Sequence, residues 1–169
     1  MLHASFLLQF APGFLYFHAM RAIIQRVQYA RITINDNIQR SIAGGACIFL
    51  GIEHEDQAGD IDWLAAKIAR LRIFDDGDGK MNLSLQDIDG EALVVSQFTL
   101  HASTKKGNRP SWIRAADPEL AEPIYAQFVL HLQDHLKKPV TTGEFGAHMN
   151  IELLNDGPVT IFIDTKNRE

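Results

Sequence analysis

The sequence predicts a single α/β domain in which mixed β-sheets pack in layers against two main helices. Of its 169 residues, 46% are hydrophobic and 22% are charged, a composition that can bury a core without disulfides or metals. Segments that alternate apolar and polar residues flank two segments with the periodicity of helices. Because the chain shows no internal repeat and no long linker, residues 20–169 are expected to form one domain.

Residues 1–19 differ in composition from the rest of the chain. They contain no Lys, Arg, Asp or Glu, and Gln9, Pro12 and Gly13 interrupt their apolar run. The segment is shorter than the ~20 apolar residues that cross a bilayer, and it lacks the basic start and the A-x-A cleavage site of a secretory leader. We therefore expect an apolar extension outside the core, with Met20 as the start of the working domain.

The first strands are predicted directly after this extension. Apolar and polar residues alternate along residues 21–34, and Asn35-Asp36-Asn37 is typical of a turn. The chain returns along residues 38–42, breaks at Gly44-Gly45 and continues as an apolar run over residues 46–52. A run that is apolar throughout predicts a strand that is buried on both faces.

The first helix is predicted over residues 60–73, with Asp60 as its N-cap. The segment from Asp75 to Gly79, which is rich in Asp and Gly, is expected to end it. Its predicted core-facing stripe consists of Ile61, Leu64, Ala65, Ile68 and Leu71.

The second helix is predicted after Asp117-Pro118, a pair typical of an N-cap and a first helical turn. Pro123 removes a backbone donor inside this segment, so we expect either a kink there or a regular helix that begins near Glu122. Its predicted core-facing stripe consists of Leu120, Ile124, Phe128, Leu132 and Leu136.

The remaining segments predict further strands and an exposed loop. Residues 91–96 form a short apolar run after Asp89-Gly90 and predict another buried strand, whereas the polar residues 101–114 predict an exposed functional loop. Strand patterning resumes at residues 148–154 and 159–164. An X-Pro turn is expected between these two strands.

Several function classes are excluded by charge and spacing. A formal net charge of −5 rules out the global basic field of duplex-DNA binders, so any nucleic-acid contact must be local. The single cysteine, Cys47, sits in an apolar run and suits the reducing cytosol, so we expect a cytoplasmic protein. Asp75–Gly79 resembles a calcium loop, but the EF-hand spacing would put Phe74 at the first ligand position.

Other catalytic motifs have little support. The chain contains no phosphate-binding P-loop motif and no G-x-S-x-G motif. His131 and His135 have the i, i+4 spacing of metal ligands, yet no Glu follows the first His, and an exposed polar face explains both. A metal-dependent hydrolase that uses these residues and His101 is a weaker alternative, and neither a metal nor a cofactor is expected.

Two short segments carry unusual residue patterns. The apolar run that begins at Leu93 ends in Ser96-Gln97-Phe98-Thr99, which puts polar side chains at the mouth of a buried strand, where α/β proteins often place sites. Residues 155–160 read Asn-Asp-Gly-Pro-Val-Thr, and an X-Pro bond loses most of the usual preference for the trans form. Taken separately, each segment is explained as well by a strand end or a turn.

Taken together, these segments and their flanks are specific. Residues 20–169 resemble the D-aminoacyl-tRNA deacylase family along nearly their whole length. The family's S-Q-x-x motif maps onto Ser96–Thr99, and its N-x-G-P-x-T motif maps onto Asn155–Thr160. Residues 1–19 have no counterpart in the family pattern, and Pro123 departs from it within the second helix. The other matching segments are Met20–Val27, Arg72–Phe74, Gly79–Leu83 and Arg109–Ser111.

The resemblance implies a deacylase-like fold and a homodimer in which each pocket receives the Gly157-cis-Pro158 element of the other subunit. The carbonyl oxygens of that element would accept the amino group of a D-aminoacyl or glycyl ester and clash with an L side chain. Asn155, Thr160 and Met149 are then expected to assist in substrate binding and in the rejection of L-amino acids. Arg26 is expected to hold the Gly-Pro element in place.

The implied reaction is hydrolysis of the ester that joins a D-amino acid to the 3'-terminal adenosine of tRNA. No His, Asp or Glu lies beside Ser96 or Thr99 in the sequence to act as a base. Thr99 could be the nucleophile, or the backbone N–H groups of Phe98 and Thr99 could form an oxyanion hole while the ribose 2'-OH assists water. We favour the second mechanism because the ester is already activated. Ser96 and Gln97 would bind the adenosine, with Phe98 as its apolar wall.

A small basic segment offers a place for the rest of the tRNA. Lys105, Lys106 and Arg109 lie in the polar loop and are expected to contact acceptor-stem phosphates. The competing hypothesis is a non-catalytic dimeric module that binds RNA ends or a partner protein and uses Ser96 and Thr99 as structural hydroxyls. Neither a membrane nor DNA is an expected partner.

Overall fold

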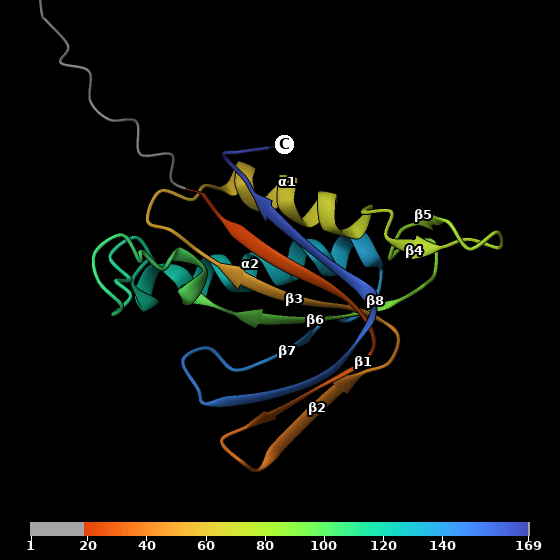
Figure 1. The fold of residues 1–169 in the computed structure, drawn as a ribbon, viewed down its shortest axis with the longest axis horizontal. Coiled ribbons are helices and arrows are strands. Elements are labelled where there is room, and N and C mark those ends of the chain that lie inside the picture. The colour runs from red at the N-terminus through yellow and green to blue at the C-terminus, as the bar shows by residue number, and fades with distance from the viewer. Residues whose placement is uncertain (1–18, 169) are drawn as a thin grey trace, which may run out of the picture.

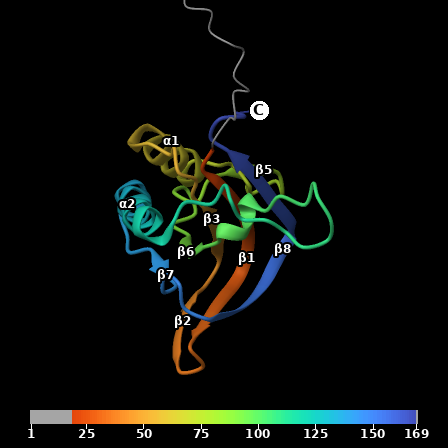
Figure 2. The same cartoon turned by 90° about the vertical axis from the view of Figure 1, so that its left-hand side faces the viewer.

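A computed structural model describes residues 19–168 as a curved, mixed β-sheet covered on one face by two helices (Figure 1 and Figure 2). In the sheet, β2 and β3 pair with successive parts of one edge of β1, and β6 and then β7 follow β3. β8 pairs with the other edge of β1. The predicted mixed α/β class is therefore confirmed. The strands of this sheet are β1 (Arg21–Ile34), β2 (Ile38–Ile42), β3 (Gly45–Gly51), β6 (Glu91–Ser96), β7 (Thr141–Thr142) and β8 (Met149–Asp164).

β1 is the central strand, and it is long enough to pair with two strands along one edge. Residues 21–27 of β1 pair with β3 and residues 30–34 pair with β2, so one edge serves two strands in succession. β3 is buried along almost its whole length, as its uninterrupted apolar run predicts. β6 runs parallel to β3, because the segment between them crosses over the sheet through a helix.

The first helix, α1 (Ala58–Ala69), begins and ends earlier than predicted. Asp60 is not its N-cap: Gln57 is, and the Asp60 carboxylate accepts the Gln57 backbone N–H at 3.1 Å from the third helical position. The helix ends before Leu71, and the carbonyl of its last residue, Ala69, accepts the backbone N–H of Gln86. The periodic pattern alone gave no sign of this partner.

The second helix, α2 (Pro118–Leu136), begins at Pro118 and continues through Pro123, so the predicted start near Glu122 is wrong. Pro123 and Glu119 are both exposed, and the Glu119 carbonyl that loses a helical donor can therefore be hydrated. The predicted stripe is also wrong at its start, because Leu120 is 40% exposed. The buried stripe drifts with the 3.6-residue period and consists of Ala121, Tyr125, Phe128, Leu132 and Leu136.

A small hairpin between α1 and β6 was not predicted. It consists of β4 (Phe74–Asp75) and β5 (Met81–Leu83), and residues 75–79, expected only to stop a helix, contribute to its turn. Asp76 accepts the backbone N–H groups of Asp78 and Lys80, and these bonds hold its pKa below the usual value. Strands this short leave no alternating pattern to recognise.

β8 is one strand where two strands and a turn were predicted. Residues 155–158 stay in the strand and are accommodated by shifts in register against β1 between Gln25 and Tyr29. The expectation for residues 1–18 lies outside the described residues, whereas Ala19 and Met20 are buried. Among residues 19–168, no helix is both long and apolar enough to cross a membrane.

Candidate active site

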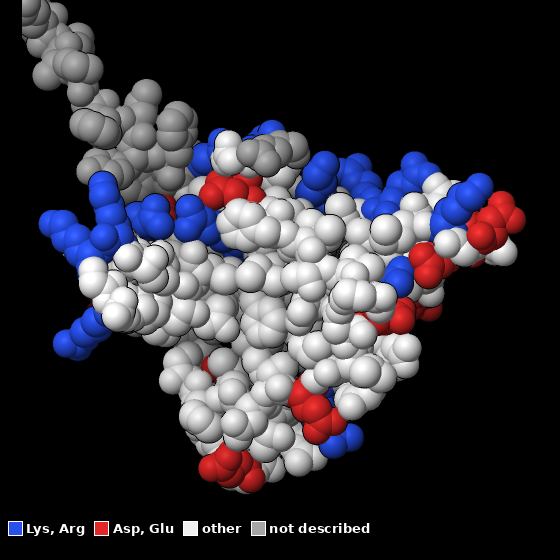
Figure 3. Space-filling model, viewed as in Figure 1, with Lys and Arg blue, Asp and Glu red and all other residues white. Residues whose placement is uncertain are grey.

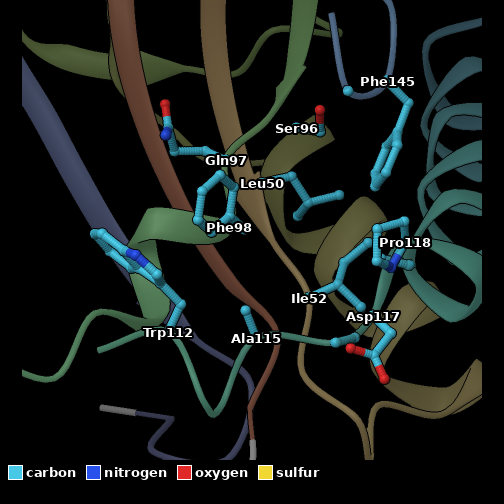
Figure 4. Close-up of a pocket in the computed structure, with 13 residues that line it drawn as sticks. Leu50, Ile52, Ser96, Gln97, Phe98, Trp112, Ala115, Asp117, Pro118 and Phe145 are labelled. Atoms are coloured by element: carbon cyan, nitrogen blue, oxygen red, sulfur yellow. The ribbon is translucent and has the colours of Figure 1, made fainter. Parts of the chain in front are cut away.

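A pocket of about 370 Å³ lies where β3 and β6 end beside the beginning of α2 (Figure 4). Leu50 and Ile52 contribute from the end of β3 and the residue after it, and Ser96 contributes from the end of β6. The lining is mainly apolar, and its few polar side chains are Ser96, Gln97 and, at the opposite end, Asp117 (Figure 4), a mixture typical of a small-molecule site. The predicted segment Ser96-Gln97-Phe98 therefore lines a real cavity.

The chain after Ser96 forms the short 3₁₀ helix η1 (Phe98–His101) at the edge of this pocket. The Gln97 backbone N–H donates to the Leu50 carbonyl at 2.7 Å, which fixes the start of η1 on β3. The Gln97 amide nitrogen donates to Thr99 Oγ1 at 2.5 Å. Thr99 is half-buried and does not line the pocket, whereas Phe98 is 55% exposed at its rim.

Three aromatic residues shape the walls, and two of them were missed by the sequence analysis. The rings of Phe98 and Trp112 pack edge to face with centroids 5.3 Å apart, and Phe145 lies on the opposite side of the pocket (Figure 4). Trp112 follows Arg109-Pro110-Ser111, and Phe145 lies two residues after Gly143. A large aromatic residue inside a polar loop is a signal that could have identified both.

Few side chains in the pocket could act as an acid or a base. Of the described residues that line it, only Asp117 has an ionisable side chain, and its carboxylate makes no capping bond to α2. His101, predicted at the start of an exposed loop, is fully buried, with Nδ1 2.9 Å from Glu53 Oε1. His131 instead contacts Asp62 on α1. Within residues 19–168, no three His, Cys, Asp or Glu side chains are grouped to hold a metal ion.

The second predicted motif lies on β8, away from this pocket. The Gly157-Pro158 peptide is cis, and both residues are exposed. Arg26, which is only 7% exposed, donates from Nε to the Asp156 carbonyl at 2.9 Å and forms an ion pair with the Asp156 carboxylate. Asn155 donates from its side chain to the carbonyls of Arg26 and Val159. Arg26 and Asn155 thus hold the chain on both sides of Gly157.

Arg26 also ties this segment to the hairpin. Its Nη1 donates to the Ile73 carbonyl at 2.8 Å and contacts the Asp75 carboxylate at 3.1 Å. Thr160 lies on β8 beside Gln25, whose side-chain amide donates to its hydroxyl. Met149 is at the other end of β8, opposite Ile34, so one chain does not bring Met149 and the Gly-Pro element together.

The three basic residues predicted to contact tRNA lie in an exposed loop. Lys105, Lys106 and Arg109 are exposed in a loop that the Ser103–Ser111 bridge closes. Figure 3 shows Lys and Arg gathered at the end of the molecule where this loop lies, and a second group over α1. An acidic protein thus carries locally basic surfaces.

Comparison with known proteins gives consistent results. The chain is 59% identical over 150 residues to a D-aminoacyl-tRNA deacylase of Bacteroides fragilis, which covers 89% of this chain and all of that protein. A solved structure, the c-Myc DNA Unwinding Element Binding Protein, superposes with a TM-score of 0.80 at 38% identity, over 85% of this chain and 97% of that one.

A second solved structure shares the fold at low identity. It is described as a probable eukaryotic D-amino acid tRNA deacylase, with a TM-score of 0.75 and 15% identity over 86% of this chain and 99% of that one. The model of the D-Tyr-tRNA(Tyr) deacylase family matches residues 23–164, which include both Ser96–Thr99 and Asn155–Thr160. The resemblance identified from the sequence is thereby confirmed, and the chain belongs to the D-Tyr-tRNA(Tyr) deacylase family.

Proposed function

We propose that this protein hydrolyses the ester bond of D-aminoacyl-tRNA, and of glycyl-tRNA, and leaves L-aminoacyl-tRNA intact. The observation that carries the proposal is a pocket rimmed by Ser96, Gln97 and Phe98 in a chain that also holds an exposed Gly157-Pro158 element. The products are a free D-amino acid and tRNA, so the reaction is a chiral proofreading step in translation. We place it in the cytoplasm, where its tRNA substrate is found.

The mechanism relies on backbone groups of η1. Phe98 and Thr99 begin a helical turn, so their N–H groups have no partner within that turn and can donate to the oxyanion that forms at the ester carbonyl. Each donor of this kind contributes roughly 10²- to 10³-fold in rate. The Thr99 hydroxyl already accepts a hydrogen bond from Gln97, which supports water assisted by the ribose 2'-OH as the attacking group.

The two motifs are too far apart to act on one ester within one chain. By strand register, Gly157 lies at the level of Arg26 on β1, and Ser96 lies at the level of Ala22. Four residues along a strand and three strand spacings across the sheet amount to roughly 13 Å and 14 Å, a separation of about 19 Å. A second copy of the chain can supply the missing half of each site.

The exposed surface of β8 supports such a homodimer. β8 pairs only with β1, so in the described part of the chain its other edge is unpaired over a strand of 16 residues. Phe162 and Leu154 are 58% and 45% exposed on this strand. Because a long, apolar, unpaired edge invites association with another chain, we assign β8 to the dimer interface.

Chiral selection then comes from the partner's Gly-Pro element. Gly157, which has no side chain, lets the backbone approach the α-carbon of the substrate closely. Carbonyl oxygens in that position accept the substrate amino group when its side chain points away, as in a D-amino acid, and collide with an L side chain. Arg26 and Asn155 keep this backbone in place, and Thr160 and Met149 complete the substrate contacts.

The tRNA is bound at its 3' end and by a small electrostatic footprint. Ser96 and Gln97 hydrogen-bond the terminal adenosine, which packs against Phe98. Lys105, Lys106 and Arg109 contact phosphates of the acceptor stem from the exposed loop. These contacts give affinity without sequence readout, as expected of an enzyme that acts on many tRNAs.

The test is deacylation of D-Tyr-tRNA and L-Tyr-tRNA side by side, with the full chain and with a chain that begins at Met20. We expect rapid loss of the D ester, stability of the L ester and equal rates for the two proteins. Size measurements on the same samples should report a dimer. A folded dimer that binds tRNA but cleaves neither ester would overturn the proposal in favour of a non-catalytic binding module.

A further inference from the structure

The turn that carries Phe98 and Thr99 lies directly on the last residue of β3. A Cβ atom at Gly51 would lie 2.9 Å from His101 Nε2, 3.0 Å from the Gln97 carbonyl oxygen and 3.0 Å from Leu100 Cβ. Two of these atoms belong to the η1 helix and the third to the residue before it. η1 can therefore pack this closely on β3 only because residue 51 is a glycine and has no side chain.

A buried contact between a histidine and a carboxylate lies beneath the same turn. His101, the last residue of η1, and Glu53, two residues after β3, are both fully buried, and their Nδ1 and Oε1 atoms are 2.9 Å apart. Glu53 is itself fixed: its backbone N–H donates to Asp56 Oδ2 at 2.8 Å, and its Oε2 accepts the Ala19 N–H at 3.0 Å. Neither His101 nor Glu53 lines the pocket, so neither is positioned to exchange protons with a substrate there.

A third contact holds η1 from another direction. Arg21 Nη1 donates to the Leu100 carbonyl at 3.1 Å, while its Nε pairs with Asp164 on β8.

Burial is the largest influence on the pKa of His101 and lowers it, whereas Gly51 and Glu53 act in the opposite direction. Because His101 and Glu53 are both fully buried, their contact is shielded from bulk water and can act as a rigid support for η1.

We propose that His101 is a positioning residue, which together with Glu53 and Gly51 sets where the backbone N–H groups of Phe98 and Thr99 point. The inference rests on the proposed ester hydrolysis and adds to it the part that aims the oxyanion donors. Such donors must lie within 2.7–3.1 Å of the oxyanion, and a misplacement of about 1 Å costs about 10²-fold in rate. The effect should fall mainly on kcat, because the oxyanion donors act only in the transition state.

The experiment compares four variants with the wild-type dimer in D-Tyr-tRNA deacylation, recording kcat, KM and the backbone amide NMR shifts of Phe98 and Thr99. His101→Leu removes the contact with Glu53, and His101→Asn restores a side-chain N–H near the position of Nδ1. Gly51→Ala keeps the His101 side chain but places a Cβ against His101 Nε2, the Gln97 carbonyl and Leu100 Cβ, and so pushes η1 away from β3. His131→Leu is the matched control, because it removes another His–carboxylate contact far from the turn.

We expect His101→Leu and Gly51→Ala to lower kcat by about 10- to 100-fold with KM changed by less than about threefold. His101→Asn should recover most of kcat, His131→Leu should leave it unchanged, and the two amide shifts should move only in the damaged variants. A folded His101→Leu or Gly51→Ala protein with normal kcat and unmoved amides would overturn the inference. So would a loss confined to KM, or an Asn variant as impaired as Leu.

The amide shifts also separate this inference from the proposed function. If the wild-type protein cleaves no aminoacyl ester but the shifts move as expected, the assigned reaction is wrong, whereas the role of His101 and Gly51 in positioning η1 is supported. If the wild-type protein is active and the variants change neither kcat nor the shifts, the reaction stands and the role of His101 is wrong.

Discussion

A site shared between two copies makes a quantitative prediction about mixed dimers. One chain carries Gly157→Ala, which damages only the Gly-Pro element, and the other carries Gln97→Ala with Phe98→Ala, which damages only η1. Each heterodimer of these chains has one site with two intact halves and one with two damaged halves. The heterodimer should therefore show about half of the wild-type activity, although both parent homodimers are nearly inactive.

The size of each defect follows from the structure. Gly157 has φ of +136°, and a Cβ there would lie 2.7 Å from Val159 Cγ2, so alanine must displace the backbone that contacts the substrate. Strain of this kind costs about 1–3 kcal/mol, less than the stability of a typical domain, so the variant should fold. Losing a base–aromatic contact of ~1–3 kcal/mol and a hydrogen bond of ~0.5–1.5 kcal/mol slows the η1 variant by about 10- to 10³-fold.

The assay uses two affinity tags to purify heterodimers and measures D-Tyr-tRNA deacylation per dimer. The mirror control joins a wild-type chain to a chain that carries all three substitutions, so that both sites contain one damaged half. It should be nearly inactive. If each chain instead contains a complete site, the mirror control keeps half of the activity and the first heterodimer has none. That reversal would refute the shared site.

Two further predictions concern charge. Burial raises the pKa of Asp56 to about 7, whereas the pKa is 3.8 in the unfolded chain. The folded protein therefore binds this proton more tightly than the unfolded chain, and the stability gained from it is lost as pH rises from about 4 to about 7. Asp56→Asn should raise the free energy of urea unfolding at pH 8 by at most about 4 kcal/mol and have little effect at pH 4; a pH-independent effect would contradict this. Lys105→Glu with Lys106→Glu should weaken binding equally for different tRNAs and reduce the salt slope by roughly 2, and unchanged binding at low salt would refute the contact.

The strands and helices could be predicted where burial leaves an apolar run or an alternation of apolar and polar residues in the local sequence. β1, β2, β3 and β6 have the alternation or apolar runs that burial imposes, and β6 was predicted at its observed bounds. The C-terminal boundary of α1 could not be predicted, because the N–H group that satisfies its last carbonyl comes from Gln86, 17 residues after Ala69. The stripe on α2 failed at Leu120 because a strict four-residue repeat departs from the 3.6-residue period.

The candidate site divides in the same way. Ser96–Phe98 and the Gly-Pro element could be identified because they are short, contiguous motifs. His101 could not, because the carboxylate that makes its burial possible belongs to Glu53, 48 residues earlier in the chain. Phe145 could have been noticed as an aromatic residue in a polar loop, but its neighbours in the pocket could not, because they depend on the path of the chain after β7.

Thr99→Val decides between the two mechanisms that the sequence leaves open. Valine has nearly the shape of threonine and keeps the backbone N–H, but it lacks the hydroxyl that accepts the Gln97 amide. If backbone donors and water carry the reaction, the variant loses one neutral hydrogen bond of ~0.5–1.5 kcal/mol, which slows deacylation by at most about 10-fold. If Thr99 is the nucleophile, the loss is at least about 10⁴-fold, because removing a nucleophile removes the covalent route. Thr99→Ser is the control, since it keeps a hydroxyl and should remain active under either mechanism. A deacylation rate for Thr99→Val within 10-fold of wild type would mean that backbone groups carry out the chemistry. Alanine substitution of Gly51 or Gly157, which set the positions of those backbone groups, should then lower the rate more than alanine substitution of any polar side chain of the pocket.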